Sequence, residues 1–161
     1  MVMIISFADK DTERLARYEF VKRFQLFERI ALRKLVQLDI AMNLDDLRVT
    51  IKKGRTMNIK KLNPVTPGEL LLEEFLVPMN LTKYRLAKDI NVSAQRIGQI
   101  VAGKRAITAD TDLRLCKYFG LSEGYWLRLQ NKYDVEVEKS KIRKQLDQIV
   151  PFAKLHLNNH N

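Results

Sequence analysis

Three long polar side chains are spaced for contact with nucleic-acid bases in the segment NVSAQRIGQIVAGKR, residues 91–105. If this segment is helical, Gln95 and Gln99 lie one turn apart on the same face, and Arg96 lies beside them. Glutamine can form two hydrogen bonds with adenine, and arginine can form two with guanine, in the major groove of DNA. The residue types and their spacing therefore indicate a helix that contacts bases. The alternative is an ordinary solvated helix face.

The residues before this helix predict a partner for it. Only Asn91, Val92 and Ser93 separate the helices expected over residues 83–90 and 94–102, and a turn this short sets two helices at a steep angle. We expect Asn91 in the left-handed conformation that reverses the chain and Ser93 as the N-cap of the second helix. The pattern predicts a helix-turn-helix motif with its isoleucines inward and its long polar side chains outward.

Side chains that suit the DNA backbone flank both helices. The first helix begins with a threonine and a lysine, and both a lysine and the amide groups of a helix start favour an anion. A lysine and an arginine follow the second helix directly after its glycine. Phosphate contacts fix the position of a protein on DNA without reading its sequence. The residues expected to make them are Thr82, Lys83, Ser93, Lys104 and Arg105.

Start and stop signals place this pair among five helices. The segment TPGE, residues 66–69, is a capping box in which Glu69 is expected to reach back to the amide of Thr66. Four further N-cap residues and two glycines at helix ends follow: Thr82, Ser93, Thr108, Ser122, Gly103 and Gly120. The expected helices cover residues 67–77, 83–90, 94–102, 109–119 and 123–138.

The composition indicates a globular protein with a polyanionic partner. The 161 residues carry a net charge of +10, which favours nucleic acid. Cys116 is the only cysteine and both histidines lie near the C-terminus, so we expect a buried, reduced thiol, no metal and no cofactor. The opening MVMIISFA is too short to cross a membrane. We therefore expect a cytoplasmic protein.

The distribution of charge divides the chain. Residues 1–62 hold fourteen basic and eight acidic side chains, residues 63–138 hold ten of each, and residues 139–161 hold five and one. Between the first two parts lies a stretch with two prolines and no apolar periodicity, which is typical of a linker. The expected units are a helical segment over 1–50, a basic linker over 51–65, a helix-turn-helix domain over 66–138, and a short helix with a disordered tail over 139–161. We expect the charge of the tail to be solvated, with DNA contact as the alternative.

The motifs of residues 63–139 carry a family resemblance. PGE at the start of the domain, the core RLA-V-RI-I-GKR-IT-DT--RL--YFG and the closing W-L--Q--YD resemble the HigA-type antitoxins, which are Xre-like helix-turn-helix proteins of bacterial toxin-antitoxin operons. The resemblance implies a mainly α, lambda-repressor-like fold. It also implies a homodimer that represses its own operon through a palindromic operator in double-stranded DNA and that neutralises a RelE-like ribonuclease toxin. Gln95, Arg96 and Gln99 match the recognition-helix positions of the family.

The first fifty residues predict a short strand at 4–7 and helices over 12–20 and 22–42. On the longer helix, a stripe from Phe24 and Phe27 through Leu38 to Met42 is expected to be buried. This region resembles the N-terminal half of HigB toxins. The later strands that carry the ribonucleolytic residues of that family are missing, so we expect no enzymatic activity.

The junction near Met57 suggests how the two parts were joined. Lys52, Lys53 and Gly54 precede Met57 and can be encoded by a purine-rich stretch that resembles a ribosome-binding site. The hypothesis is that a truncated toxin frame was fused to an antitoxin that began at Met57, and the alternative is a basic linker without that history. Two functions therefore compete with DNA binding: a toxin-neutralising interaction module, and a fusion to an inactive ribonuclease remnant.

Overall fold

The computed structural model describes residues 4, 6–25, 27–42, 46 and 63–151, and these residues form a mainly α fold. The elements are α1 (Lys10–Ala16), the 3-10 turn η1 (Lys22–Phe24), α2 (Glu28–Ile40), α3 (Pro67–Leu70), the π-helical η3 (Leu71–Leu76), α4 (Lys83–Asp89), α5 (Ala94–Val101), α6 (Ala109–Phe119) and α7 (Tyr125–Leu146). The described part of the chain contains no strand, so the strand expected at 4–7 is not found at its described residues. Residues 51–62 of the linker expected over 51–65, and the end of the tail, lie outside the described residues.

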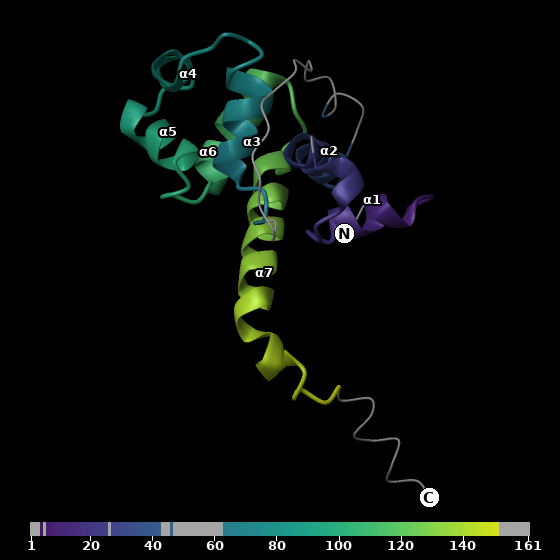
Figure 1. The fold of residues 1–161 in the computed structure, drawn as a ribbon. Helices are drawn as coiled ribbons and strands as arrows, with labels where there is room; N and C mark the ends of the chain where they lie inside the picture. The colour runs from purple at the N-terminus through teal and green to yellow at the C-terminus, as the bar shows by residue number, and fades with distance from the viewer. Residues whose placement is uncertain (1–3, 5, 26, 43–45, 47–62, 152–161) are drawn as a thin grey trace, which may run out of the picture.

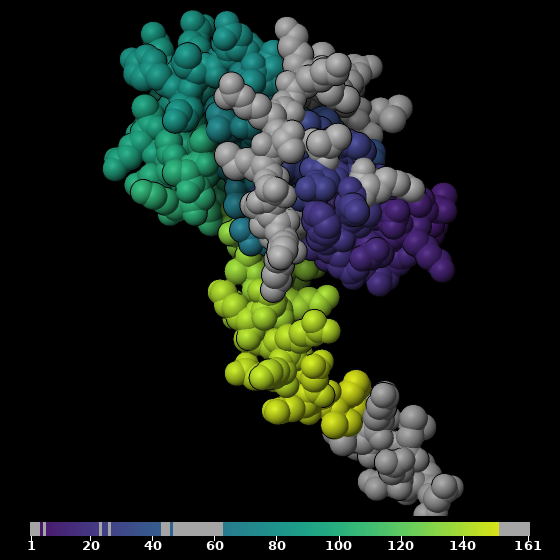
Figure 2. All heavy atoms as spheres, viewed as in Figure 1, coloured from purple at the N-terminus to yellow at the C-terminus, as the bar shows by residue number. Residues whose placement is uncertain are grey.

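The helices are arranged with the helix-turn-helix pair at one side of the molecule (Figure 1). In this view α4 and α5 lie on the left, α1 and α2 lie on the right, and α3, α6 and α7 stand between them. The C-terminal half of α7 extends beyond the rest of the body (Figure 2). The α4–α5 pair is therefore on the side of the molecule away from the N-terminal segment, by which we mean the described residues between 4 and 46.

Aromatic side chains form the centre of the core. Tyr125 and Trp126 at the start of α7 are fully buried, as is Phe75 of η3. The ring centres of Phe75 and Trp126 are 5.0 Å apart, and those of Phe75 and Phe119 are 4.8 Å apart with the rings tilted by 54°. Buried aromatic rings contribute large apolar areas, so these side chains join η3, α6 and α7 into one unit. Three residues of α2 belong to the same cluster of buried side chains: Leu32, Val36 and Ile40.

The buried face of α2 differs from the expected stripe. Phe27, Leu38 and Met42 are about half exposed or more, although their spacing predicted burial. The backbone at Phe27 is not helical, because the helix begins only at Glu28, and Met42 lies beyond its end at Ile40. Leu38 is within the helix but on its exposed face. The helix is therefore shorter than expected at both ends. Its fully buried apolar side chains are Leu32, Val36 and Ile40, and Ala31 and Leu35 are partly buried beside them.

A charged network joins α2 to the first helix of the helix-turn-helix domain. Arg29 binds Glu69 through both carboxylate oxygens, with Nε 2.7 Å from Oε1. Arg33 lies 2.8 Å from Glu74 and 3.3 Å from Glu69, and Lys34 also donates to Glu74. We expected the Glu69 carboxylate to accept the Thr66 amide, but the arginines of α2 bind that carboxylate instead. Only half of the capping box forms, with Thr66 Oγ1 accepting the Glu69 amide at 3.0 Å.

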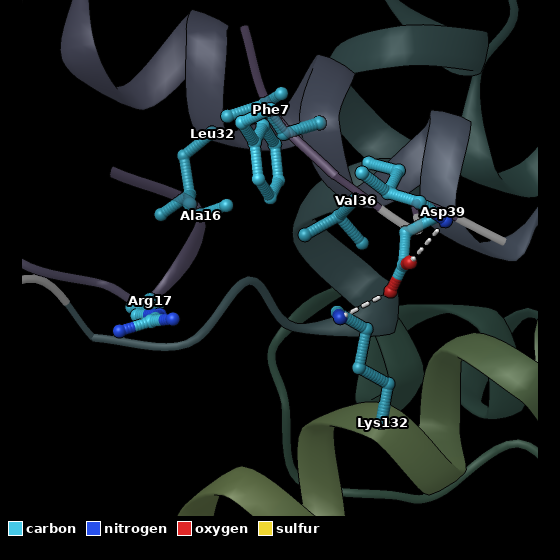
Figure 3. Close-up of a pocket in the computed structure, with 9 residues that line it drawn as sticks. Phe7, Ala16, Arg17, Leu32, Val36, Asp39 and Lys132 are labelled. Atoms are coloured by element: carbon cyan, nitrogen blue, oxygen red, sulfur yellow. Dashed lines mark hydrogen bonds and ion pairs between the residues drawn. The ribbon is translucent and has the colours of Figure 1, made fainter. Parts of the chain in front are cut away.

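A second set of contacts joins the N-terminal segment to α7. Lys132 donates to Asp39 of α2, which also accepts the Ile4 amide at 3.3 Å (Figure 3). Arg128 donates to the carbonyl of Ile40 at 2.7 Å. A cavity of about 130 Å³ lies beside Asp39 and is lined mostly by apolar side chains, among them Phe7, Leu32 and Val36. The N-terminal segment is thus bound to the domain at both α3 and α7.

The start of α7 corrects one expectation. Ser122 was expected to cap this helix, but the helix begins at Tyr125 after Gly124 in a left-handed conformation. Asp112 of α6 accepts the amides of Gly124 at 2.7 Å and of Trp126 at 2.8 Å and so provides the cap. Ser122 instead binds Asp46 through its amide and its hydroxyl, each at 2.8 Å. The short helix expected after residue 139 is a continuation of α7 to Leu146.

Candidate nucleic-acid interface

The turn between α4 and α5 has the expected conformation. Asn91 has a φ of 54°, in the left-handed region. Its amide donates to the Lys88 carbonyl at 3.2 Å, and the next amide, that of Val92, donates to the Ala87 carbonyl at 2.9 Å. These two bonds form the pattern that closes a helix at a left-handed residue. The three-residue turn therefore places α5 directly after α4 without leaving these amide groups unpaired.

Both helices of the motif are capped by the side chains that the sequence predicts. Thr82 Oγ1 accepts the Arg85 amide at 3.1 Å at the start of α4, and Ser93 Oγ accepts the Arg96 amide at 3.2 Å at the start of α5. Thr108 also begins a helix, α6, but its side chain caps no amide there. A cap removes the cost of exposed amide groups and fixes where the helix begins. The start of α5 is thus defined to the residue.

The position of α5 depends on a glycine in α3. A methyl group at Gly68 would lie 1.9 Å from the Ile100 carbonyl oxygen and 2.8 Å from the Cα of Val101. Ile97 and Ile100 face inward and are buried. Gly98, on the other face of α5, has nothing within 4 Å of the place of a Cβ. The helix therefore packs backbone against backbone with α3 and leaves an open outer face.

The three candidate base-contacting residues differ in exposure. Gln95 is exposed, and Gln99 and Arg96 are partly exposed. Arg96 is also the only one of the three whose side chain bonds to another described residue: its Nη1 lies 2.6 Å from Oδ2 of Asp110 on α6. The glutamines are thus free to contact a base, whereas the guanidinium of Arg96 is bound at one nitrogen.

Residues spaced four apart on α6 support the motif. Each contacts a different part of it, so that α6 is joined to α5, to the turn and to α4. The three contacts are Asp110 to Arg96, Arg114 Nη1 to the Ile90 carbonyl at 3.0 Å, and the Tyr118 hydroxyl to Asp89 at 3.0 Å. The motif is therefore positioned by polar contacts as well as by its apolar core.

The candidate phosphate contacts lie on the surface around α4 and α5. Thr82, Lys83 and Ser93 are exposed, as are Lys104 and Arg105. Neither Lys104 nor Arg105 forms an ion pair with another described residue, and both follow Gly103, whose φ is 67°. Their charges are available for an anion. Arg85, by contrast, is paired with Asp89 at 2.8 Å.

Gly68 and Asp110 position the motif and Asp112 caps α7, and sequence reasoning identified none of the three. Gly68 lies within the recognised capping box, but nothing in the sequence shows which backbone it would approach. Asp110 and Asp112 occupy the first turn of α6, where acidic residues are ordinary. Their long-range partners Arg96 and Trp126 become apparent only in the folded chain.

Metal-binding side chains and reactive thiols were also sought among the described residues. These residues contain no group of three side chains suited to hold a metal ion. Cys116 is buried as expected, and burial, together with the nearby Asp112, raises the pKa of its thiol to about 11. A thiol with such a pKa is a poor nucleophile at neutral pH. No helix of the described part of the chain has the length and apolar character needed to cross a membrane.

Comparison with known proteins identifies the family of this domain. Residues 72–126 match the helix-turn-helix family model. The virulence-associated protein I of Dichelobacter nodosus is 43% identical over 89 residues, which cover 55% of this chain and 82% of the relative. The antitoxin HigA of Pseudomonas aeruginosa, solved with the higBA promoter, is 35% identical, with a TM-score of 0.53 over 56% of this chain and 99% of that one. An addiction module antidote protein of the HigA family from Coxiella burnetii is 37% identical, with a TM-score of 0.54 over 56% of this chain and 100% of that one. The chain belongs to the HigA-type family of helix-turn-helix proteins.

Proposed function

We propose that this chain is a DNA-binding antitoxin and transcriptional regulator whose helix α5 enters the major groove. The observation that carries the proposal is the outer face of α5, which presents Gln95 and Gln99 to solvent beside Gly98. Glutamine matches the hydrogen-bonding groups of adenine, and the open space at Gly98 allows close approach to base edges. Arg96 is the third base contact, with guanine as its preferred base. The HigA structure with the higBA promoter supports this use of the fold.

The phosphate contacts proposed for this domain surround α5. Lys83 and Thr82 contact the backbone before the motif, Ser93 contacts it at the start of α5, and Lys104 with Arg105 contact it after α5. Because residues 63–138 carry equal numbers of basic and acidic side chains, general attraction to DNA is weak for this domain. Its affinity therefore depends on these few placed cations, and each of them contributes to binding at any sequence.

The proposed regulator is a homodimer that binds a palindrome. Two recognition helices about 34 Å apart would meet two half-sites on one side of the DNA. The dimer would repress its own operon and would bind a RelE-like toxin as its protein partner. The family assignment of this chain supports these proposals.

For the N-terminal segment we propose a structural role as a built-in partner of the domain, derived from the truncated N-terminal half of a HigB-like toxin. Its buried ion pairs, above all Arg33 with Glu74, support an intramolecular packing role. The described part of the segment packs beside α3 and α7, on the side of the molecule opposite α4 and α5 (Figure 1). DNA binding and the presence of this segment are therefore compatible.

A footprint of the full chain on the DNA upstream of its own gene tests the proposed function. We expect two protected half-sites related by a two-fold axis, with centres one helical turn apart. A Lys104→Ala variant should weaken this protection and the binding of unrelated DNA to the same extent. If the chain shows no preference for any upstream sequence over unrelated DNA, the proposal is wrong.

A further inference from the structure

Arg96 carries a charge on the proposed base-contacting face, and this charge is compensated within the protein. Its Nη1 donates to Oδ2 of Asp110 at 2.6 Å, while Oδ1 of Asp110 accepts Nε of Arg114 at 2.8 Å. The hydrogen bonds from Arg114 and from Arg96 hold the pKa of the Asp110 carboxyl below its ordinary value. Asp110 is therefore ionised at neutral pH, and Arg96 forms a salt bridge across α5 and α6.

The salt bridge leaves part of the guanidinium of Arg96 unused. Nε and Nη2 share one edge of this planar group, and neither donates to another described residue. Two parallel N–H groups on one edge are the arrangement that binds O6 and N7 of guanine. Asp110 thus holds the side chain at one nitrogen while the edge suited to a base stays free.

The charge of Asp110 also affects whether Arg96 binds the phosphates of the DNA backbone. An arginine without a carboxylate partner is attracted to the phosphates of any sequence, which raises non-specific affinity. Asp110 is about half exposed in the first turn of α6, so its negative charge both compensates Arg96 and repels a phosphate nearby. Specificity is a difference between affinities, and a repulsive group can increase it by weakening the wrong complex.

We propose that Asp110 is a specificity-determining residue: it positions Arg96 toward a base edge and keeps its guanidinium away from the phosphates. The proposal rests on the proposed function, in which α5 enters the major groove. Asp110 acts through Arg96 and does not itself contact DNA. Its presence lowers the affinity for DNA of any sequence and raises the preference for the operator.

The test uses the full chain and two duplexes, one enriched by the wild-type chain from a randomised pool and one with the same bases shuffled. In Asp110→Asn the side chain keeps its size but loses its charge, and because it is half exposed the variant should fold. We expect the variant to bind the shuffled duplex more tightly, because Arg96 gains a phosphate contact. The slope of log affinity against log salt concentration should become more negative by about one. The affinity for the enriched duplex divided by that for the shuffled duplex should fall about fivefold. This is the low end of the discrimination that one bidentate base contact provides.

A charge-matched variant separates this effect from a general change in charge. Glu73→Gln also removes one carboxylate from the domain, but Glu73 is an exposed residue of η3 and lies outside the helix-turn-helix motif. We expect it to change the affinity for both duplexes in parallel and to leave their ratio unchanged. Equal ratios for wild type and Asp110→Asn would overturn the proposal.

A double variant tests whether Asp110 acts through Arg96. In an Arg96→Ala background, Asp110→Asn should change neither the ratio nor the salt dependence, because the side chain that it positions is absent. If the gain on shuffled DNA persists in that background, the released Arg114 or the lost charge causes it, and the proposal is wrong. If the wild-type chain enriches no duplex at all, the proposed function itself fails, which is a different result from a failure of Asp110.

Discussion

The backbone of Gly68 in α3 touches the backbone of Ile100 in α5, so closely that a Cβ on Gly68 would lie 1.9 Å from the Ile100 carbonyl oxygen. Both partners in this contact are main chain, so no change of rotamer can relieve it. The contact fixes how far α5 stands from α3, and it therefore fixes the position of the outer face of α5. A residue outside the helix-turn-helix motif thus positions the recognition helix.

Gly68→Ala is expected to destabilise the protein and weaken DNA binding together. Forcing a methyl group into this contact should cost at least about 1 to 3 kcal/mol of the free energy of unfolding, because α5 must move. Urea unfolding measures the loss. The matched control is Gly98→Ala, at an open position of α5, which should be neutral or stabilising through helix propensity. Equal stability of the two variants would show that α3 and α5 are not in close contact.

Glu74→Ala is expected to loosen the N-terminal segment from the domain. The change leaves the guanidinium of Arg33, whose side chain is only 10% exposed, without its nearest carboxylate. Leaving a buried charge with no partner costs about 3 to 5 kcal/mol, and we expect a smaller loss here because Glu69 stays 3.3 Å from Arg33. The neighbouring Glu73 is exposed, so Glu73→Ala is a control with the same change of side chain. A free energy of unfolding that is the same in both variants would mean that α2 does not pack on η3.

Asp46 should make the stability depend on pH in the acid range. Burial would raise the pKa of its carboxyl, but hydrogen bonds from the Met42 amide and from Ser122, with the nearby Arg128, hold it below the ordinary value of 3.8. A group with a lowered folded pKa stabilises above its unfolded pKa, and this contribution is lost as the pH falls through the folded value.

The measurement compares the free energy of unfolding of wild type and Asp46→Asn between about pH 6 and pH 3, the range around an ordinary aspartate pKa. We expect the wild type to lose more stability than the variant as the pH drops below 3.8. Asp134→Asn, an exposed change on α7, is the control and should follow the wild type. Parallel curves for wild type and Asp46→Asn would contradict the contact between Asp46 and Ser122.

The helix-turn-helix motif could be predicted from the sequence because its signals are local. Thr82 and Ser93 cap the helices that they precede, and Asn91 adopts the left-handed conformation expected of it. Each of these features depends on residues within one or two helical turns. The ends of α4 and α5 accordingly agree with the expected ranges to within one residue.

Features set by distant partners could not be predicted in this way. Ser122 has the sequence context of an N-cap, but Asp112 caps α7 and the hydroxyl of Ser122 binds Asp46. Glu69 likewise completes a capping box by sequence, but Arg29 and Arg33 bind its carboxylate. In each case a charged group far away in the chain offers a stronger contact than the local one. The charge of Arg96 and its compensation by Asp110 belong to the same class.

The central claim is that the outer face of α5 contacts bases, and the sequence preference of Gln99→Ala tests it most directly. The wild type and the variant are each used to enrich duplexes from the same randomised pool, and the preference at every base pair is compared. We expect the variant to lose preference at one base pair in each half-site, by about 1 to 3 kcal/mol, with its affinity for shuffled DNA unchanged. An unchanged preference, or equal losses on enriched and shuffled duplexes, would contradict the placement of α5 in the major groove.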